Sequence, residues 1–203
     1  MTVQFGCVVE GHGEREAVPV LLRRIVQCID PAISVEVRHP VRFPKSRLLK
    51  AGNLERAVQQ AALGLGGAAA ILVLLDSDND APCILGPELL ARAQAARADL
   101  PVGVVLPQRE FEAWFLAAAR SLRGHRGLPE DLDPPEEPEL VPGAKEWLSR
   151  RMGRHGYSAP LDQPALAALF DMQQALRTGS LDKCYREVQR LLRELSIRQS
   201  QRL

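Results

Sequence analysis

The sequence predicts an α/β protein: a mostly parallel sheet of four strands flanked by helices, with a helical C-terminal extension. Two observations carry this prediction. Short, nearly continuous apolar segments alternate along the first half of the chain with longer segments of helical periodicity. Most of the apolar segments contain no regularly spaced polar residues, which is typical of parallel strands covered by helices on both faces.

The expected elements follow one another in a regular order. Residues 3–9 form a buried strand, and the glycines within residues 10–13 allow a tight turn after it. A helix is predicted over residues 14–29, with acids at its start, where the helix dipole favours negative charge. The other elements of this half are strands at 33–39, 68–75 and 102–106, and helices at 53–65, 86–98 and 109–122.

The composition changes after residue 126. Residues 127–143 are rich in prolines and acids and have no apolar periodicity, so we expect a surface loop outside the core. Three amphipathic helices are predicted beyond it, at 144–157, 163–176 and 180–195, followed by a frayed tail. The predicted organisation is therefore an α/β core over 1–126, an acidic loop over 127–143 and a helical extension over 144–203 packed on the core. The leucines of 188–195 either form a dimer surface or cover the sheet.

Length, net charge, apolar content and cysteine spacing limit the kinds of partner and location that we expect. The chain has 203 residues, 46% of them hydrophobic, and a formal net charge of +1, so any anionic partner must be bound by a local patch. No window approaches the roughly 20 apolar residues of a membrane span, and we expect a cytoplasmic protein with no membrane partner. The four cysteines have no CxxC pairing, so we expect reduced thiols.

Carboxylates follow three of the predicted strands. The stretch "LLDSDND" ends a strand in closely spaced acids, another acid ends the first strand, and two more follow the last. Ligand sites of open parallel sheets lie at the carboxyl ends of the strands, where these acids meet. Oxygen ligands of this kind favour Mg²⁺, or Mn²⁺, as one or two ions. The predicted metal ligands are Glu10, Asp76, Asp78, Asp80, Glu110 and Glu112.

Other interpretations of "DSDND" were compared. A calcium loop of the EF-hand type requires Gly at its sixth position and Glu at its twelfth, where this chain has Ala81 and Pro87, so that interpretation fails. A phosphatase that carries two aspartates at the end of a strand fits poorly, because its nucleophile belongs to an early strand. A solvated acidic turn without a ligand stays open as an alternative.

Three segments together carry a resemblance to a known fold: "VVEGHGERE", "LLDSDND" and "REFEAWFLAAA", in this order. The combination resembles the Toprim domain of topoisomerases, bacterial primases and overcoming-lysogenization-defect nucleases. Over about residues 3–195 the chain resembles a bacterial Toprim-like family, domain of unknown function 4276. The resemblance implies a Toprim-like, Rossmann-like core.

The resemblance also implies residue roles. Glu10 would be the Toprim glutamate, acting as general acid or base or as a metal ligand, and Asp76 and Asp78 would hold magnesium. Glu112 would complete a second metal position, so these four form the predicted catalytic set, with Glu110 and Asp80 in support. The first-turn acid Glu14 is expected to favour the helix dipole more than to bind a ligand.

Basic residues supply the predicted nucleic-acid contacts. The segment "RHPVRFPKSRLLK" contains no acid, and one more arginine precedes the last pair of glutamates. The predicted phosphate-binding residues are Arg38, Arg42, Lys45, Arg47, Lys50 and Arg109. A second basic group, formed by Lys145, Arg150, Arg151 and Arg154, is better explained as a solvated helix face. The aromatic residues Phe111, Trp114, Phe115 and Trp147 are expected in the core.

These features predict magnesium-dependent hydrolysis of phosphodiesters in DNA or RNA, and the resemblance places it in bacterial defence or nucleic-acid processing. Strand passage is not expected, because the tyrosines, Tyr157 and Tyr185, belong to the helical C-terminal part. Two alternatives stay open: a non-catalytic Toprim-like module within a larger complex, and a hydrolase of nucleotides or small phosphates. A protein partner and a homodimer also stay open.

Overall fold

The computed structural model describes residues 2–153 and 156–201. Its centre is a parallel sheet in the order β2-β1-β4-β5, with a short strand β3 that also pairs with β1. This arrangement confirms the predicted α/β class. The strand not predicted is β3, two residues that continue the edge of the sheet beside the end of β1. The strands are β1 (Thr2–Val9), β2 (Ser34–Val37), β3 (Val41–Arg42), β4 (Ala68–Leu74) and β5 (Val102–Val105).

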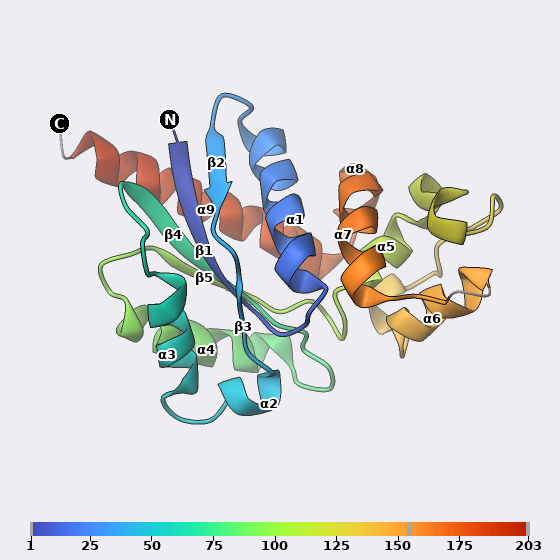
Figure 1. The fold of residues 1–203 in the computed structure, drawn as a ribbon, viewed down its shortest axis with the longest axis horizontal. Coiled ribbons are helices and arrows are strands. Elements are labelled where there is room, and N and C mark those ends of the chain that lie inside the picture. Colours follow the sequence, from blue (N-terminus) through green and yellow to red (C-terminus); the bar gives the residue numbers. More distant parts are fainter. Residues whose placement is uncertain (1, 154–155, 202–203) are drawn as a thin grey trace.

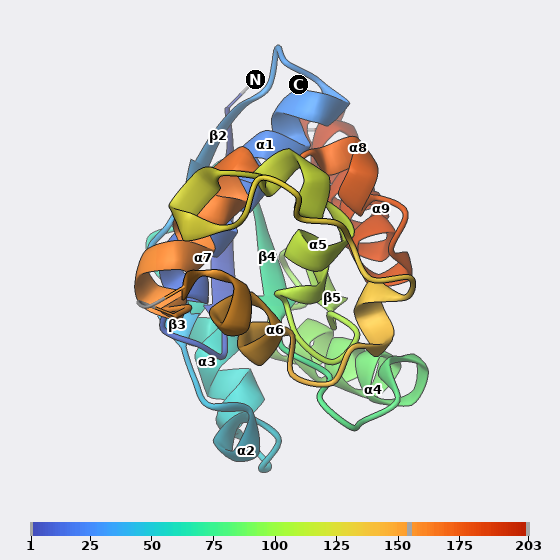
Figure 2. The same ribbon diagram turned by 90° about the vertical axis from the view of Figure 1, so that its right-hand side faces the viewer.

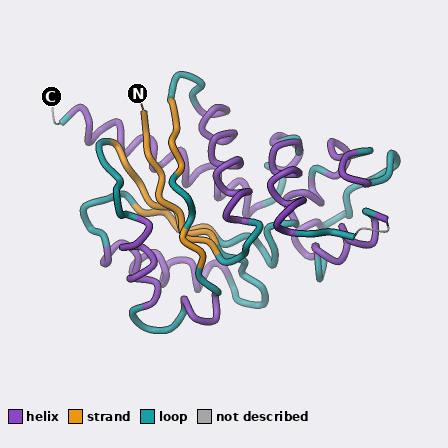
Figure 3. The backbone as a smooth tube through the Cα atoms, viewed as in Figure 1, coloured by secondary structure: helices purple, strands orange, loops and turns teal. Residues whose placement is uncertain are grey.

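The central strand β4 explains why the apolar segments are continuous. Its alternate side chains enter two separate cores, because successive residues of a strand point to opposite faces. Leu72 and Leu74 pack with α1 and α9, whereas Ile71 and Val73 pack with α3 and α4. Figure 3 shows helices on both sides of the strands. These covering helices are α1 (Glu14–Ile29), α3 (Asn53–Ala61), α4 (Pro82–Ala96) and α9 (Gly179–Ser200).

Short helices gather beyond the carboxyl ends of β4 and β5, as Figure 1 shows; Figure 2 views the molecule from that side. They are α5 (Ala113–Ala117), α6 (Ala144–Arg151), α7 (Ala159–Leu169) and α8 (Met172–Ala175), and α2 (Lys45–Leu48) follows β3. The contact of α7 with the start of α1 requires Gly13, where an added Cβ would collide with the carbonyl oxygen of Ala159. The group of helices α5–α8 is therefore joined tightly to the sheet at the turn after β1.

The last helix, α9, covers one face of the sheet together with α1. Leu191, Leu192 and Leu195 are buried in the main core, so these leucines cover the sheet. The prediction of a frayed tail was wrong as far as Ser200, because the helix continues to that residue. There Arg198 donates to the carbonyl oxygen of Asp99 at 2.6 Å and holds the last turns in place.

The expectation that residues 127–143 lie outside the core was also wrong. Leu128 and Leu132 are each only 3% exposed and belong to the main core. The carboxylate of Glu139 accepts hydrogen bonds from the backbone N–H groups of Gly179 and Ser180 and so caps α9. The proline and acid content of this segment predicts a loop, but the segment contributes two leucines to the core and a capping carboxylate to α9.

Two predicted helices are divided in the structure. The helix expected over 109–122 begins only at Ala113, because Arg109 has a left-handed φ of 61°. The helix expected over 163–176 breaks before Asp171, whose side chain accepts hydrogen bonds from two backbone N–H groups of α8. The four aromatic residues predicted in the core are buried, as expected, and all four cysteines are free thiols. Among the described residues, no helix is both long and apolar enough to cross a membrane.

Candidate active site

The predicted acids meet at the carboxyl edge of the sheet. Glu10 follows β1, Asp76 follows β4, and Glu110 and Glu112 follow β5. Pairing of the last two strands continues past their ends, since Ser77 N–H donates to the carbonyl oxygen of Pro107 at 3.0 Å. The backbone N–H of Phe111 then donates to Asp76 Oδ1 at 2.8 Å and brings the segment after β5 against the end of β4.

Lys145 lies among three of these carboxylates. Its Nζ is 3.2 Å from Asp76 Oδ2, 3.5 Å from Glu112 Oε2 and 3.8 Å from Glu110 Oε2. Its backbone N–H also donates to Glu110 Oε2, at 3.1 Å. We predicted from the sequence that Lys145 lies on a solvated helix face. In the structure its ammonium is directed at the acids. We call Asp76, Glu110, Glu112 and Lys145 the inner group.

A second lysine holds the exposed acids. Lys45 is 6% exposed, and its Nζ lies 2.9 Å from Asp78 Oδ2, 3.0 Å from Asp80 Oδ2 and 2.6 Å from the carbonyl oxygen of Ser77. The carboxylates of Asp78 and Asp80 are themselves more than half exposed. Lys45 was predicted to contact nucleic acid, but in the structure its ammonium is directed at aspartates. We call Asp78, Asp80 and Lys45 the outer group.

Glu14 is a residue that the sequence analysis underrated. It is 3% exposed, and its Oε2 accepts hydrogen bonds from the backbone N–H groups of Glu10 at 2.8 Å and Gly11 at 3.0 Å. The available signal was its position four residues after Glu10, across a turn that leads directly into a helix. Burial, with the nearby charges of Asp76 and Glu112, raises the pKa of Glu14 to about 8.

Three further acids of the site also have raised pKa values. Burial raises the pKa of Glu112 to about 7, with Asp76 acting in the same direction and Lys145 opposing it. The pKa of Asp76 is raised by burial, although Lys145 and the Phe111 N–H favour its charged form. The pKa of Glu10 is raised by burial and by the charges of Asp76 and Asp78. Carboxylates packed this closely favour a further cation, which would return them to their charged forms.

Tyr157 is a further residue that the sequence analysis did not assign to the site. Its hydroxyl donates to Glu112 Oε1 at 2.8 Å, and burial next to this carboxylate raises the pKa of the phenol. The tyrosine is thus a protonated donor that orients Glu112. Nothing in its sequence neighbourhood signals this, because Tyr157 and Glu112 are 45 residues apart and meet only through the fold.

Backbone strain is concentrated beside the acids. Asp78 and Arg109 both have left-handed φ values, 53° and 61°, which non-glycine residues rarely adopt. Asp78 N–H donates to the carbonyl oxygen of Arg109 at 3.0 Å, and Arg109 N–H donates to Ser77 Oγ at 2.8 Å. Residues held in this way cost about 1–3 kcal/mol each and are found most often at functional sites.

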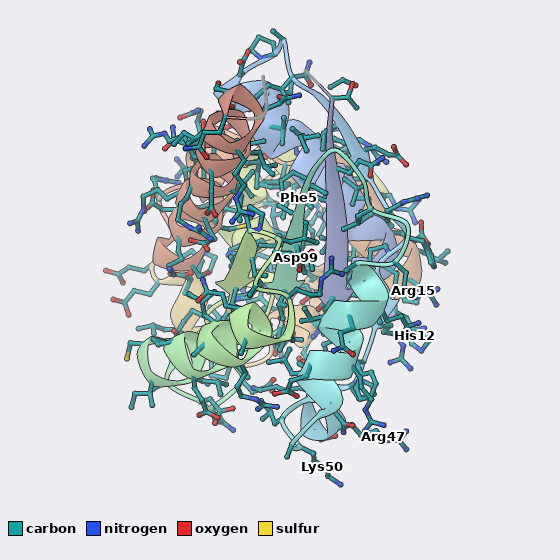
Figure 4. All side chains as sticks on the ribbon, turned by 90° about the vertical axis from the view of Figure 1, so that its left-hand side faces the viewer. Phe5, His12, Arg15, Arg47, Lys50 and Asp99 are labelled. Atoms are coloured by element: carbon teal, nitrogen blue, oxygen red, sulfur yellow. The ribbon has the colours of Figure 1, made fainter. Side chains whose placement is uncertain are left out.

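The predicted basic residues divide into three sets. Arg42 Nη1 donates to the carbonyl oxygen of Glu10 at 3.3 Å, and Arg109 lies between the two acidic segments, so both are at the centre with Lys45. Arg47 and Lys50 are exposed and extend outward at the α2 end of the molecule, as Figure 4 shows. Arg38 is not part of the site, because it donates to the carbonyl oxygen of Gly64 at 2.6 Å in the loop before β4.

The second basic group is also dispersed. The guanidinium of Arg151 lies 3.6 Å from the centre of the Trp147 ring, a cation–π contact on the exposed side of α6. Arg150 is exposed, and Arg154 lies outside the described residues. Of this group, only Lys145 joins the acids.

The donor set fits a hard divalent cation, although no ready-made cage exists. No three His, Cys, Asp or Glu side chains within 2–153 and 156–201 converge as a metal-binding group. Two buried carboxylate oxygens, Glu10 Oε2 and Glu112 Oε2, have no hydrogen-bond partner among the described residues. Glu112 Oε2 is 3.5 Å from Lys145 Nζ, whereas Glu10 Oε2 has no ion pair in the described part of the chain and is available as a ligand. All the acids offer oxygen donors, as magnesium and manganese prefer. Rotation of side chains would be needed to bring them into a coordination sphere.

Comparison with known proteins gives one match. A family model described as "Domain of unknown function (DUF4276)" matches residues 9–196, which begin at the last residue of β1 and include the acids, the later strands and most of α9. No curated protein matches the chain, and no solved structure does.

Proposed function

The chain belongs to the DUF4276 family, and we propose that it is a metal-dependent phosphodiesterase that cleaves DNA or RNA. The observation that carries the proposal is the set of buried, mutually repelling carboxylates Glu14, Asp76 and Glu112 beside strained backbone at the ends of parallel strands. Burying several acids together costs folding free energy, and acids buried in this way are found most often at functional sites.

The residues present can divide the work of phosphoryl transfer. A bound magnesium or manganese ion supplies activation of water and neutralisation of charge on the phosphate. Arg109 and Arg42 are the cations placed to contact a phosphate that approaches the acids. Glu10 is partly exposed at the open side and has a buried carboxylate oxygen without a hydrogen-bond partner among the described residues, which suits a ligand of that ion.

An extended substrate fits the site better than a small one. The outer group is open to solvent, with Asp78 and Asp80 more than half exposed, and Arg47 and Lys50 continue the charged surface outward. A hydrolase of nucleotides would enclose its substrate to exclude water and fix its orientation. A site with solvent-exposed acids at its outer side admits a polymer.

A tyrosine nucleophile has no support in the geometry. Tyr157 is partly buried and its hydroxyl donates a hydrogen bond to Glu112, and Tyr185, on α9, packs partly buried against the core. Neither phenol faces a phosphate held by the acids, so water is the proposed nucleophile. The Toprim resemblance adds a proposed setting, cytoplasmic bacterial defence or nucleic-acid processing.

The test is cleavage of supercoiled plasmid, single-stranded DNA and RNA by the purified protein, with EDTA, Mg²⁺ or Mn²⁺. Asp76→Asn removes a central charge with little change of shape, and Asp99→Asn is the matched control at the other end of the sheet. We expect cleavage that requires metal, is lost in Asp76→Asn and persists in Asp99→Asn. Absence of cleavage by a folded protein under every metal condition would reject the proposal and favour the non-catalytic module.

A further inference from the structure

The carboxylates at the site differ in whether they have a cationic partner. In the inner group, Asp76, Glu110 and Glu112 share Lys145, and in the outer group Asp78 and Asp80 share Lys45. Glu10 and Glu14 are the exception. No ion pair within 4.0 Å reaches either of them from the described part of the chain, although each lies near Asp76. The negative charge without a partner is therefore on the β1 side of Asp76.

Lys145 is held where it is by the fold. Its own N–H donates to Glu110, and the next turn of α6 buries Trp147 and Leu148. The helix begins after Gly143, which has a left-handed φ of 68° and lets the chain turn sharply onto the acids. The packing of α6 thus places the Lys145 ammonium beside the acids.

Asp76 lies between Lys145 on one side and the β1 acids, Glu10 and Glu14, on the other. Its Oδ2 faces Lys145 at 3.2 Å, and its Oδ1 accepts the Phe111 N–H at 2.8 Å and keeps a second lone pair. Two-metal phosphodiesterases place a shared aspartate between two cations about 4 Å apart. Here one of the two positions around such an aspartate already contains a cation.

We propose that the Lys145 ammonium takes the place of a second metal ion, so that the chain binds a single divalent ion, between Glu10, Glu14 and Asp76. The inference rests on the proposed function and specifies its metal content. A second divalent ion among Asp76, Glu110 and Glu112 would have to displace an ammonium that contacts all three, against the repulsion of two positive charges at short range. Lys145 then supplies the positive charge that a second ion supplies elsewhere.

The test counts bound ions, independently of cleavage. Metal-stripped wild-type protein, Lys145→Met and Lys145→Arg are titrated with Mn²⁺ near pH 8, with free Mn²⁺ measured by electron paramagnetic resonance. Lys183→Met, at an exposed lysine on α9, is the matched control. We expect one ion in the wild type, the control and Lys145→Arg, and two ions in Lys145→Met.

The outcomes separate this inference from the function it rests on. Two ions in the wild type would overturn the inference and leave the metal-dependent phosphodiesterase in place, and this count needs no variant to fold. A single ion in folded Lys145→Met would also overturn it, because removal of the ammonium would have opened no second position. Absence of Mn²⁺ binding to folded wild-type protein would overturn both.

Discussion

The inner and outer groups contain the same chemistry in opposite arrangements. In the inner group two of the three acids, Asp76 and Glu112, are buried at 5% and 0% exposure, Glu110 is partly buried, and the Lys145 side chain is 41% exposed. In the outer group the lysine is buried and the aspartates are open to water. Both groups bring lysine and carboxylate within 4 Å, so proximity does not distinguish them.

Solvent access distinguishes the two groups. An exposed carboxylate keeps its hydration and gains little from an ion pair, whereas a buried one depends on its partner for most of its stabilisation. The inner group should therefore respond strongly to pH, to loss of its lysine and to metal, and the outer group should respond weakly. Four predictions follow this contrast, beginning with the largest effect.

Catalysis should separate the groups most clearly. Asp76→Asn is expected to lower metal-dependent cleavage at least about 100-fold, because it removes the charge shared by the site, while Asp80→Asn lowers it less than about fivefold. Initial rates on one substrate at saturating Mg²⁺ measure both. Thermal unfolding confirms that the variants are folded. Equal losses in the two variants would remove the distinction between the groups.

Stability of the metal-free protein should fall as pH rises. The pKa values of Glu14 and Glu112 are raised in the folded state to about 8 and about 7, so their neutral forms favour folding. This stabilisation is complete below the unfolded-state pKa near 4.5 and is lost as pH rises through the folded-state values. We expect the free energy of unfolding to decrease by about 2 kcal/mol or more between pH 5 and 8.5.

Urea unfolding in EDTA at several pH values measures this decrease. Glu14→Gln, which stays neutral at every pH, should flatten the profile, and saturating Mn²⁺ should restore stability at high pH. A profile that is flat or rises toward pH 8.5 in the wild type would contradict the inner group as described.

Loss of the inner lysine should be costly only where the acids are ionised. Lys145→Met is expected to destabilise the metal-free protein by about 2 kcal/mol at pH 8, less than for a fully buried pair because the lysine is partly solvated. At pH 5.5 Glu112, whose pKa is raised to about 7, is largely neutral, and the cost should be under about 1 kcal/mol. Lys45→Met, whose partners are exposed, should cost about 1 kcal/mol at both pH values. A larger loss for Lys45→Met at pH 8 would reverse the ranking.

The smallest expected effect concerns Tyr157. Tyr157→Phe removes the donor to Glu112 and should cost about 1 kcal/mol, because a buried carboxylate oxygen loses its partner. Tyr185→Phe is the matched control, since no hydrogen bond of its hydroxyl is found among the described residues, and it should cost under about 0.5 kcal/mol. Chemical denaturation at pH 8 compares them, and identical values would show that the Tyr157 hydroxyl does not support Glu112.

Much of the architecture could be read from local pattern. The strands β1, β4 and β5 were expected because their apolar residues are continuous, and the acids were expected at one edge because parallel strands end together. The pattern failed where backbone geometry depends on distant contacts. The left-handed Arg109 shortens a predicted helix, and Leu128 and Leu132 join the core from a segment whose prolines and acids predict a loop.

The sequence by itself determined the order of elements, the class of fold and the common location of Glu10, Asp76 and Glu112. Periodicity and strand polarity are local properties, and they are sufficient for these. Only the tertiary structure decided which basic residues contact the acids. Lys145 and Lys45 form ion pairs with them, whereas Arg38 binds the loop before β4. The tertiary structure also brings the Tyr157 hydroxyl to Glu112. The physical reason is that the charge state of a buried carboxylate depends on neighbours within a few ångströms, and those neighbours come from segments far apart in the chain.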